Sequence, residues 1–267
     1  MENLLKIKDQ YFDLIKNDTF DYQKFNQFAI VFHSNAIEGS TLTIEETFLL
    51  LDEHLTPNSK PLEHTLMPID HLDALKFVVE LANQKTLLTV ELIQKISALV
   101  MKSTGSKISS MAGDFNSSKS DFRKLTVRAG TTTFMDYKKV PQRVAELVQY
   151  LNENINTYTD FEAINKLAFE THYQLVTIHP FADGNGRMSR LLMKYVQQFH
   201  GLPLSVVFQE DKIQYINALQ ETRQQEDVPI FTDFMFQQTE KFLQQQIATL
   251  TKSQTTGNKL KGFQFLF

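Results

Sequence analysis

Apolar residues recur at helical spacing along most of this 267-residue chain. Intervals of about three and four residues place them on one face of a helix, which can then pack against a core. The pattern predicts helices over residues 69–83, 90–101, 141–154, 160–178, 186–200, 212–224 and 230–249. Asp160 is the predicted N-cap of the fourth helix, because its carboxylate can accept a hydrogen bond from the first helical turn.

One segment departs from the helical pattern. Residues 125–134 (LTVRAGTTTF) are rich in β-branched side chains that partly alternate, and Ala129-Gly130 interrupts the run. This combination is typical of a short hairpin, and it is the only good strand candidate in the sequence. The expected fold class is therefore all-α, a mainly helical bundle with one short β-hairpin.

The clearest break in the chain is the segment TPNSKP at residues 56–61, with Pro68 shortly after it. It separates an N-terminal helical region, residues 1–60, from a core region, residues 61–250, and residues 251–267 form a C-terminal tail. The tail ends in the apolar sequence KGFQFLF, which suits docking on the body of the protein or self-association. A homo-oligomer is therefore one expected state.

Composition narrows the classes of function. A net charge of −4 and a pI near 6.0 give no basic footprint, which argues against nucleic acid as the main partner. The sequence has no Cys, which excludes disulfides and thiolate chemistry. No apolar run has the length of a membrane span and the N-terminus has no apolar signal core, so a cytoplasmic protein without membrane contact is the expectation.

Residues 179–190 (HPFADGNGRMSR) combine a proton acceptor, a carboxylate, a glycine-rich turn and two cations. Pro180 disfavours a helical conformation at His179, which places this imidazole at or just past the end of the preceding helix. Asp183-Gly184 and Asn185-Gly186 are turn signals, and apolar residues resume helical spacing after them. The predicted unit is helix, tight loop, helix.

A glycine-flanked turn that opens a helix directs backbone N–H groups into one concavity, where the helix dipole attracts anions such as phosphate. Arg187 and Arg190 share a face of the first turn, where cations are disfavoured unless an anion lies between them. A carboxylate beside phosphates, here Asp183, is best explained by a bridging Mg²⁺. His179, with an ordinary pKa of about 6.5, can take a proton from an attacking hydroxyl.

The segment resembles, residue by residue, the signature of Fic domains, His-x-Phe-x-(Asp/Glu)-Gly-Asn-Gly-Arg-x-x-Arg. The resemblance implies transfer of AMP from ATP to a Ser, Thr or Tyr hydroxyl of a target protein, with release of pyrophosphate. By this resemblance His179 is the general base and Asp183 the Mg²⁺ ligand, while Gly184, Asn185 and Gly186 cradle the α- and β-phosphates. Arg187 and Arg190 hold the outer phosphates, and Phe181 anchors the loop in the core. Related Doc-type kinases carry Lys where this chain has Gly186, which favours adenylylation over phosphorylation.

A second segment gains meaning from the first. Residues 25–38 have near-helical spacing and Gly39 follows as the predicted C′ residue, which puts Glu38 in the last turn, where its charge opposes the helix dipole. Ser34-x-x-x-Glu38-Gly39 resembles the inhibitory motif of Fic proteins, whose Glu pairs with the second Arg of the signature, here Arg190. The resemblance implies an autoinhibited AMP-transferase able to modify itself. Removal of AMP from targets, or a catalytically silent nucleotide-binding regulator, stays open as the alternative.

The resemblance also gives the predicted hairpin a role. Fic proteins have a flap before the signature that clamps the target segment by main-chain pairing, a form of strand addition. The flap residues implied here are Thr126, Val127, Arg128, Thr131, Thr132 and Thr133. The family usually has a Gly-x-Tyr-Arg-like stretch just before, whereas this chain has GDFN at residues 113–116 and then a polar run at 117–121. This departure leaves the Arg contact unassigned and suggests a mobile loop.

Two further residues have alternative interpretations. Tyr215 lies in a segment, KIQYINAL, that resembles the family helix after the core, whose Tyr lines the adenine pocket, but a core-packing Tyr fits equally well. His172 lies seven residues before His179 on one predicted helix. No third ligand with metal spacing accompanies them, so a packed helix residue is the better interpretation of His172 than a zinc ligand.

Overall fold

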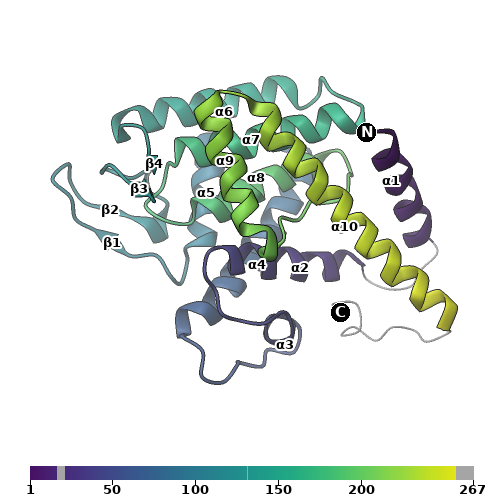
Figure 1. Cartoon of the computed structure of the whole chain (residues 1–267). Helices are drawn as coiled ribbons and strands as arrows, with labels where there is room; N and C mark the ends of the chain where they lie inside the picture. The colour runs from purple at the N-terminus through teal and green to yellow at the C-terminus, as the bar shows by residue number, and fades with distance from the viewer. Residues whose placement is uncertain (17–21, 131, 257–267) are drawn as a thin grey trace. The chain divides into compact units, whose positions relative to one another are not determined.

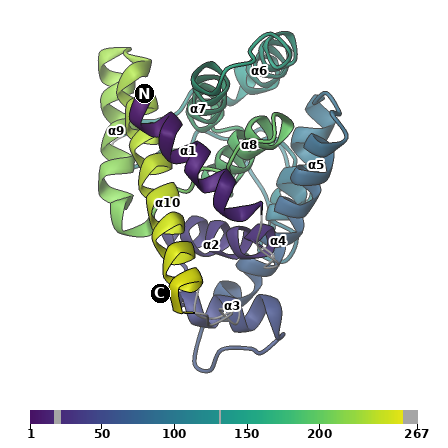
Figure 2. The ribbon, with the colours of Figure 1, turned by 90° about the vertical axis from the view of Figure 1, so that its right-hand side faces the viewer.

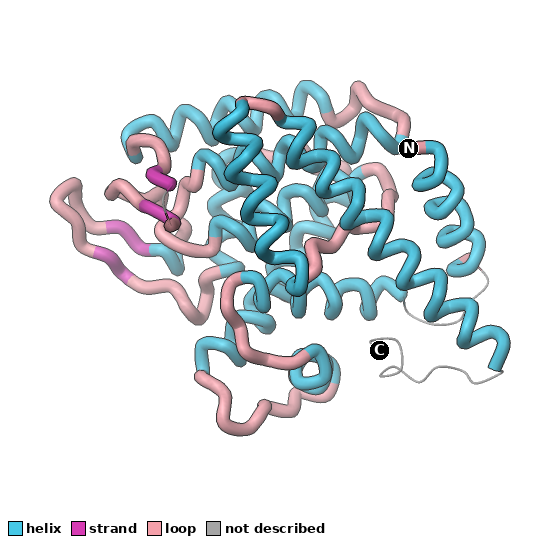
Figure 3. Tube along the Cα trace, in the orientation of Figure 1, coloured by secondary structure: helices cyan, strands magenta, loops and turns pink. Residues whose placement is uncertain are grey.

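The structure, a computed structural model, describes residues 1–16, 22–130 and 132–256 of the chain. Ten α-helices and two short antiparallel hairpins make up these residues, together with three 3-10 turns (Figures 1 and 3). The expected fold class, all-α with a small β element, is confirmed. Among the described helices, none combines the length and the hydrophobicity needed to cross a membrane.

Packing divides the chain into two units. One is the core unit, Pro61–Leu202, and the other joins residues 1–60 to the described residues from Pro203 onward. The division at residue 60 coincides with the TPNSKP break, whereas the sequence indicated no boundary near residue 203. The apolar sequence KGFQFLF at the C-terminus lies outside the described residues.

The core unit is built around α8, Asn185–Phe199, which is buried along nearly its whole length. It packs against α4 (Leu62–Asn83), α5 (Val90–Val100) and α7 (Phe161–Ile178), and α6 (Val140–Asn154) packs on α7 (Figure 2). The side chains that make these contacts on α8 include Met188, Leu191 and Tyr195, all fully buried. A helix enclosed in this way holds its first turn, and the loop before it, in a rigid frame.

Local signals set the helix ends. The Ala163 amide donates to the Asp160 carboxylate over 2.8 Å, which confirms the predicted N-cap of α7. Thr89 caps α5 in the same way through the Leu92 amide. The predicted start of α4 at residue 69 was wrong, since the helix begins at Leu62 and runs through Pro68. Pro68 removes one backbone donor near the start of a helix whose inner face is buried, so packing outweighs the local preference.

The core unit also contains two hairpins. The predicted one pairs β3, Arg128–Ala129, with β4, Thr132–Thr133, in the register Arg128 to Thr133. The second pairs β1, Lys107–Ile108, with β2, Phe115–Asn116, so the prediction of a single strand region was wrong. The polar run after Phe115 does not form the expected loop but a 3-10 turn, Ser117–Lys119, capped by Asn116. The segment at β1 and β2 lacks the run of β-branched residues that indicated the predicted hairpin.

The other unit contains α1 (Glu2–Ile15), α2 (Tyr22–Ile37), α3 (Ile44–Asp52), α9 (Lys212–Gln225) and α10 (Val228–Thr256). α10 packs along α1 and against α9, so the first and last described helices lie side by side (Figure 2). α3 opens with a capping box, in which Thr43 and Glu46 each bond the other's backbone amide. α2 is tied to this unit by His33, whose Nδ1 accepts a hydrogen bond from the Gln209 amide over 3.2 Å.

Candidate active site

His179 lies directly after α7, as the Pro180 signal predicted. Its amide donates to the Leu175 carbonyl over 2.9 Å, and its backbone has the left-handed conformation, with φ of 52°. This conformation is uncommon for a residue with a side chain and recurs at functional sites, where the surrounding structure holds it in place. The helix therefore ends by turning the imidazole out of the helical path.

The imidazole ring is held from two sides. The ring of Phe134 stacks on it, with centroids 3.7 Å apart and planes 20° from parallel. Its Nδ1 lies 3.3 Å from the Val176 carbonyl oxygen, which can only accept, so this contact favours a proton on Nδ1. A neutral ring with Nδ1 protonated presents Nε2 as the basic atom. The arrangement is that of an imidazole ready to accept a proton at Nε2.

Arg123 connects the loop after α7 to the flap hairpin, and the sequence analysis missed it. The side chain is 1% exposed, and Nε donates to the His179 carbonyl over 2.7 Å. Nη1 donates to the Leu125 carbonyl over 2.8 Å and Nη2 to the Met135 carbonyl over 2.6 Å, one on each side of the hairpin. Its own amide donates to the Pro180 carbonyl over 3.0 Å. One buried guanidinium thus fixes the loop after α7 and both ends of the flap hairpin.

The sequence contains the Arg of the family pattern, but it lies further along the chain than that pattern implies. The family pattern implies an Arg three residues after Gly113, where this chain has Asn116, whereas Phe122-Arg123 follows the polar run at residues 117–121. That run folds into the 3-10 turn after β2, so the extra residues are accommodated before Arg123. Burial lowers the pKa of Arg123, with the Asp136 carboxylate opposing the effect.

Asn185 closes the loop between α7 and α8. Its side-chain oxygen accepts a hydrogen bond from the Phe181 amide, and its side-chain nitrogen donates to the Phe181 carbonyl, each over 2.9 Å. The Phe181 side chain is 1% exposed and thus anchors the loop in the core, as expected. Because its side chain is used in this way, Asn185 offers a phosphate only its backbone N–H.

Gly184 is required by both conformation and space. Its φ is 77°, and a Cβ added there would lie 2.8 Å from the Met101 sulfur. Met101 is held by the turn after α5, where Asp70 accepts hydrogen bonds from the Ser103 amide over 2.6 Å and from the Ser103 hydroxyl over 2.8 Å. The tertiary structure therefore brings α5 against the loop so closely that only glycine fits.

α8 begins at Asn185, where the sequence predicts the phosphate cradle. The first amides of a helix have no intrahelical acceptor, and the dipole makes this end attractive to anions. Gly186 in the first turn adds no side chain that would keep a phosphate away. Asp183 is exposed beside it, and one of its oxygens accepts from the Gly184 amide over 2.6 Å. An exposed carboxylate next to a phosphate cradle fits Mg²⁺, which takes few protein ligands and keeps several waters.

A row of buried cations follows along α8. Arg187 is 2% exposed, Arg190 1% and Lys194 2%. The Arg187 guanidinium contacts the Met101 sulfur over 3.2 Å and the Val100 carbonyl oxygen over 3.5 Å. Lys194 lies four residues beyond Arg190 on the same face, and the sequence analysis missed it because it lies outside the signature. Its seven-residue spacing from Arg187 is the signal that would have indicated it.

Two buried histidines border this row. The pKa of His71 lies well below 6.5 because of burial and the charges of Arg187, Arg190 and Lys194, and burial and the latter two cations lower that of His172. Both rings are therefore neutral at neutral pH, and His172 is a packed residue, as interpreted from the sequence. Burial, and then Arg190, lower the pKa of Lys194 to about 7. The face is thus strongly electropositive, which suits a polyphosphate.

Residues 34–39, which resemble the inhibitory motif, have the backbone conformation expected at the end of a helix. α2 ends at Ile37, one residue earlier than expected, and Glu38 follows at once with its side chain exposed. Gly39 has φ of 103°; its amide donates to the Ala36 carbonyl, and the Ser40 amide donates to the Asn35 carbonyl, each over 3.0 Å. This is the predicted glycine C-terminus. Ser34 is buried on α2.

The remaining predicted residues are placed as follows. Thr126 and Val127 precede β3, Arg128 is in β3, and Thr132 and Thr133 form β4, while Thr131 lies outside the described residues. Tyr215 is buried on α9, with its ring centroid 6.2 Å from that of Phe231 and 6.3 Å from that of Phe234 on α10. These contacts fit the core-packing interpretation of Tyr215, and an adenine contact stays a prediction.

The fold and site define a helical protein with an imidazole at the end of one helix and an anion-binding N-terminus at the start of the next. Residues 87–197 match the model of the Fic/DOC family. This part of the chain is a Fic domain. It spans the flap and almost all of α8, and includes Arg123 and Lys194.

Curated relatives agree with this assignment. The chain is 29% identical to a protein adenylyltransferase Fic of Nematostella vectensis, over 84% of this chain and 49% of the relative. It is 27% identical to one of Drosophila mojavensis, over 89% of this chain and 46% of the relative. The chain thus spans about half the length of the curated relatives it matches.

Two solved structures share the fold. One is a Fic domain containing signalling protein from Bacteroides thetaiotaomicron, with a TM-score of 0.78 at 22% identity over 97% of this chain and all of that chain. The other is Fic-1 from C. elegans, with a TM-score of 0.75 at 20% identity over 96% of this chain and 72% of that chain.

Proposed function

We propose that this protein is an adenylyltransferase, which transfers AMP from ATP to a Ser, Thr or Tyr hydroxyl of a target protein. The observation that supports the proposal best is the pairing of two features across one short loop. The His179 imidazole is set up to accept a proton at Nε2, and the loop that follows opens α8 with a phosphate cradle. The names of the curated relatives point to the same reaction.

The reaction follows from these positions. The target hydroxyl oxygen attacks the α-phosphorus of ATP while His179 Nε2 takes the hydroxyl proton. The new bond joins the hydroxyl oxygen to the α-phosphorus, and the bond from that phosphorus to the bridging oxygen breaks, so that pyrophosphate leaves with the electron pair. General-base catalysis of this kind contributes about 10²–10⁴-fold to a rate.

The α8 residues bind the leaving group. Amides of the first turn face the phosphates, and Arg187 and Arg190 neutralise the outer ones. Mg²⁺, when bound by Asp183, would supply positive charge against the phosphate oxygens. The target segment pairs with the flap, which places its hydroxyl toward the ring that Phe134 holds.

The resting enzyme is restrained by Glu38, which pairs with Arg190 and thereby prevents productive placement of the γ-phosphate. Glu38 follows the C-terminus of α2, where a carboxylate opposes the helix dipole and gains from a cationic partner. Arg190 is a buried cation, and an anionic partner offsets part of the desolvation cost of a buried cation. ATP competes for the same guanidinium. A cytoplasmic location and a homo-oligomeric state stay predictions from the sequence.

The test is AMP incorporation measured by intact-mass spectrometry after incubation with ATP and Mg²⁺. Glu38→Gly should raise self-modification above that of the unsubstituted chain, because Arg190 becomes available to ATP. Glu53→Gly, which removes another exposed carboxylate that follows a helix, is the matched control and should leave incorporation unchanged. His179→Ala in the Glu38→Gly background should abolish the gain.

Each result separates the alternatives. Incorporation that is equal with and without Glu38 would overturn the autoinhibition. A Glu38→Gly variant that binds ATP but never incorporates AMP would favour the silent nucleotide-binding regulator. Loss of AMP from the modified protein after ATP is removed, provided that it needs Glu38, would show that the protein also reverses the modification.

A further inference from the structure

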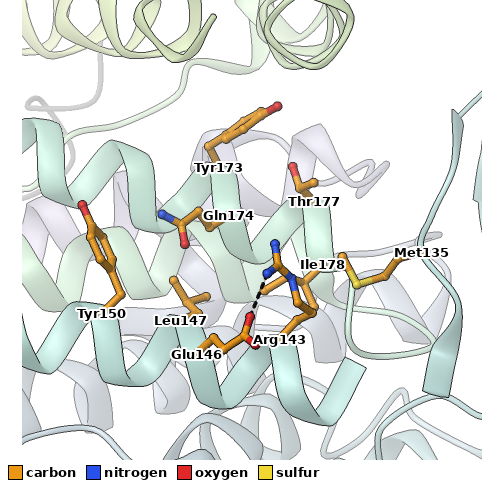
Figure 4. A pocket seen from close by; sticks show the side chains of 9 residues that line it. All are labelled: Met135, Arg143, Glu146, Leu147, Tyr150, Tyr173, Gln174, Thr177 and Ile178. Carbon is orange, nitrogen blue, oxygen red and sulfur yellow. Dashed lines mark hydrogen bonds and ion pairs between the residues drawn. The ribbon is translucent and has the colours of Figure 1, made fainter. Parts of the chain in front are cut away.

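A pocket of about 360 Å³ lies between α6 and α7 in the core unit (Figure 4). Its walls come from three segments: the chain that follows β4, one face of α6, and the last two turns of α7. The size is at the lower end of the range for pockets that bind small molecules. It is therefore suited to one large side chain.

The pocket is lined by sequence neighbours of both His179 and Phe134. Ile178, which lines it, directly precedes His179, and Met135, which also lines it, directly follows Phe134, whose ring stacks on His179. Arg123 holds both positions, since it donates to the carbonyls of His179 and Met135. A target side chain in this pocket therefore lies beside the side chain that presents its hydroxyl to His179.

The base of the pocket is apolar, and the one acidic and the one basic side chain in its lining form an ion pair. Leu147 is 2% exposed and Ile178 5%, so both present apolar surface from the core. The two charged side chains in the lining pair with each other, Arg143 Nη1 to Glu146 Oε2 over 2.7 Å (Figure 4). An acidic or basic occupant would have to compete with that ion pair. The lining therefore favours a neutral side chain.

The sides of the pocket offer hydrogen bonds. Thr177 Oγ1 is buried with no hydrogen-bond partner among the described residues, and Gln174, about one turn earlier on α7, also lines the pocket. The Tyr150 hydroxyl donates to Glu170 over 3.1 Å, and burial with this carboxylate raises its pKa to about 12, so its phenol stays neutral. An occupant with an apolar body and a polar edge matches this lining.

We propose that the pocket selects targets by receiving an aromatic side chain two residues from the modified hydroxyl. This inference rests on the proposed AMP transfer. A segment that adds to the flap as a strand is extended, so residues two apart face the same side at a spacing of about 6.6 Å. When one of them presents its hydroxyl to His179, the other faces the pocket beside it.

The test uses a peptide library with one fixed Thr and randomised positions on either side, incubated with ATP and Mg²⁺. Both the unsubstituted chain and Glu38→Gly are assayed, and the modified peptides are sequenced. We expect aromatic residues to be enriched at one position two residues from the Thr, by roughly tenfold, the lower end of what burial of a large side chain gives. Neighbouring positions, which face away, should show no such enrichment.

Two variants connect this preference to the pocket. Gln174→Trp fills the space and should remove the enrichment, while peptides with Ala at that position keep their rate within about twofold. Gln149→Trp, the same change at an exposed site on α6, is the matched control and should keep the enrichment. Thr177→Val, which needs no repacking, should reduce the preference for Tyr over Phe at that position.

The outcomes separate this inference from the function on which it rests. Enrichment that is absent, or that Gln174→Trp leaves intact, would overturn the pocket's role while AMP transfer stands. Self-modification without modification of any peptide would also overturn it, since the preferred sequences are present in the library. If no variant transfers AMP to itself or to peptide, the proposed function itself has failed.

Discussion

Replacement of Arg123 tests how the flap and the catalytic loop are held together. Arg123→Met keeps most of the buried apolar volume but removes three side-chain hydrogen bonds, to the carbonyls of His179, Leu125 and Met135. The three carbonyl oxygens then lose their cationic donor. The stacking of Phe134 on His179 loses its support at the same time, because the flap is no longer tied to the loop.

The size of the effect follows from these contacts. A hydrogen bond from a charged donor contributes about 1.5–3 kcal/mol, so three independent bonds would sum to about 4.5–9 kcal/mol. Methionine avoids the desolvation of a buried cation, and effects of neighbouring bonds are not additive. We therefore expect a loss of about 3 kcal/mol. When this loss of free energy acts entirely by misplacing His179 in the transition state, AMP transfer falls by up to about 100-fold.

The assay combines two measurements. Hydrogen exchange of the Phe134 amide, which donates to the Val127 carbonyl over 3.1 Å, reports opening of the flap and should accelerate. AMP transfer by Arg123→Met in the Glu38→Gly background should fall while the Kd for ATP stays within about twofold, because Arg123 lies outside the phosphate cradle. Arg123→Lys should recover part of the activity, and Lys124→Met, which removes the exposed neighbouring cation, should have no effect. Unchanged exchange together with unchanged transfer in Arg123→Met would refute this reasoning.

Two further predictions concern α8 and the loop before it. Gly184→Ala should destabilise the protein by roughly 1–3 kcal/mol in urea unfolding, because an alanine at φ of 77° is strained and its Cβ lies 2.8 Å from the Met101 sulfur. Adding Met101→Ala should restore only the steric part of this loss. An unchanged urea midpoint in Gly184→Ala would contradict the close approach of α5. Lys194, with its pKa lowered to about 7, binds fewer protons in the folded state than an unfolded Lys does between pH of about 7 and 10.4. Stability should therefore rise with pH across this window, and Lys194→Met should lack that part of the rise when urea midpoints are compared at pH of about 7 and 9. An equal rise in Lys194→Met would show that the charge of Lys194 is already compensated.

Local signals account for the parts of the structure that the sequence predicted well. Asp160 caps α7, Pro180 ends it, and Gly39 ends α2 in the left-handed conformation, each through bonds that span only a few residues. The flap was visible because its β-branched residues and its glycine turn are contiguous. The segment at β1 and β2 was not, because it has no such run of β-branched residues and its pairing depends on contacts up to eleven positions apart, such as that of Ser117 Oγ with the Ser106 amide.

The sequence by itself determined the candidate site: a helix, a loop and a helix that place His179, Asp183 and the amides of α8 within twelve residues. Contiguity is enough there, because the turn and the helix ends follow from nearest neighbours. Only the tertiary structure decided that Arg123 bonds the carbonyl of His179, that Met101 lies against Gly184, and that Lys194 is a buried cation. Each of these depends on which distant helices pack together. The guanidinium, the thioether and the ammonium group act as they do because they are buried, and no local sequence pattern specifies which side chains become buried.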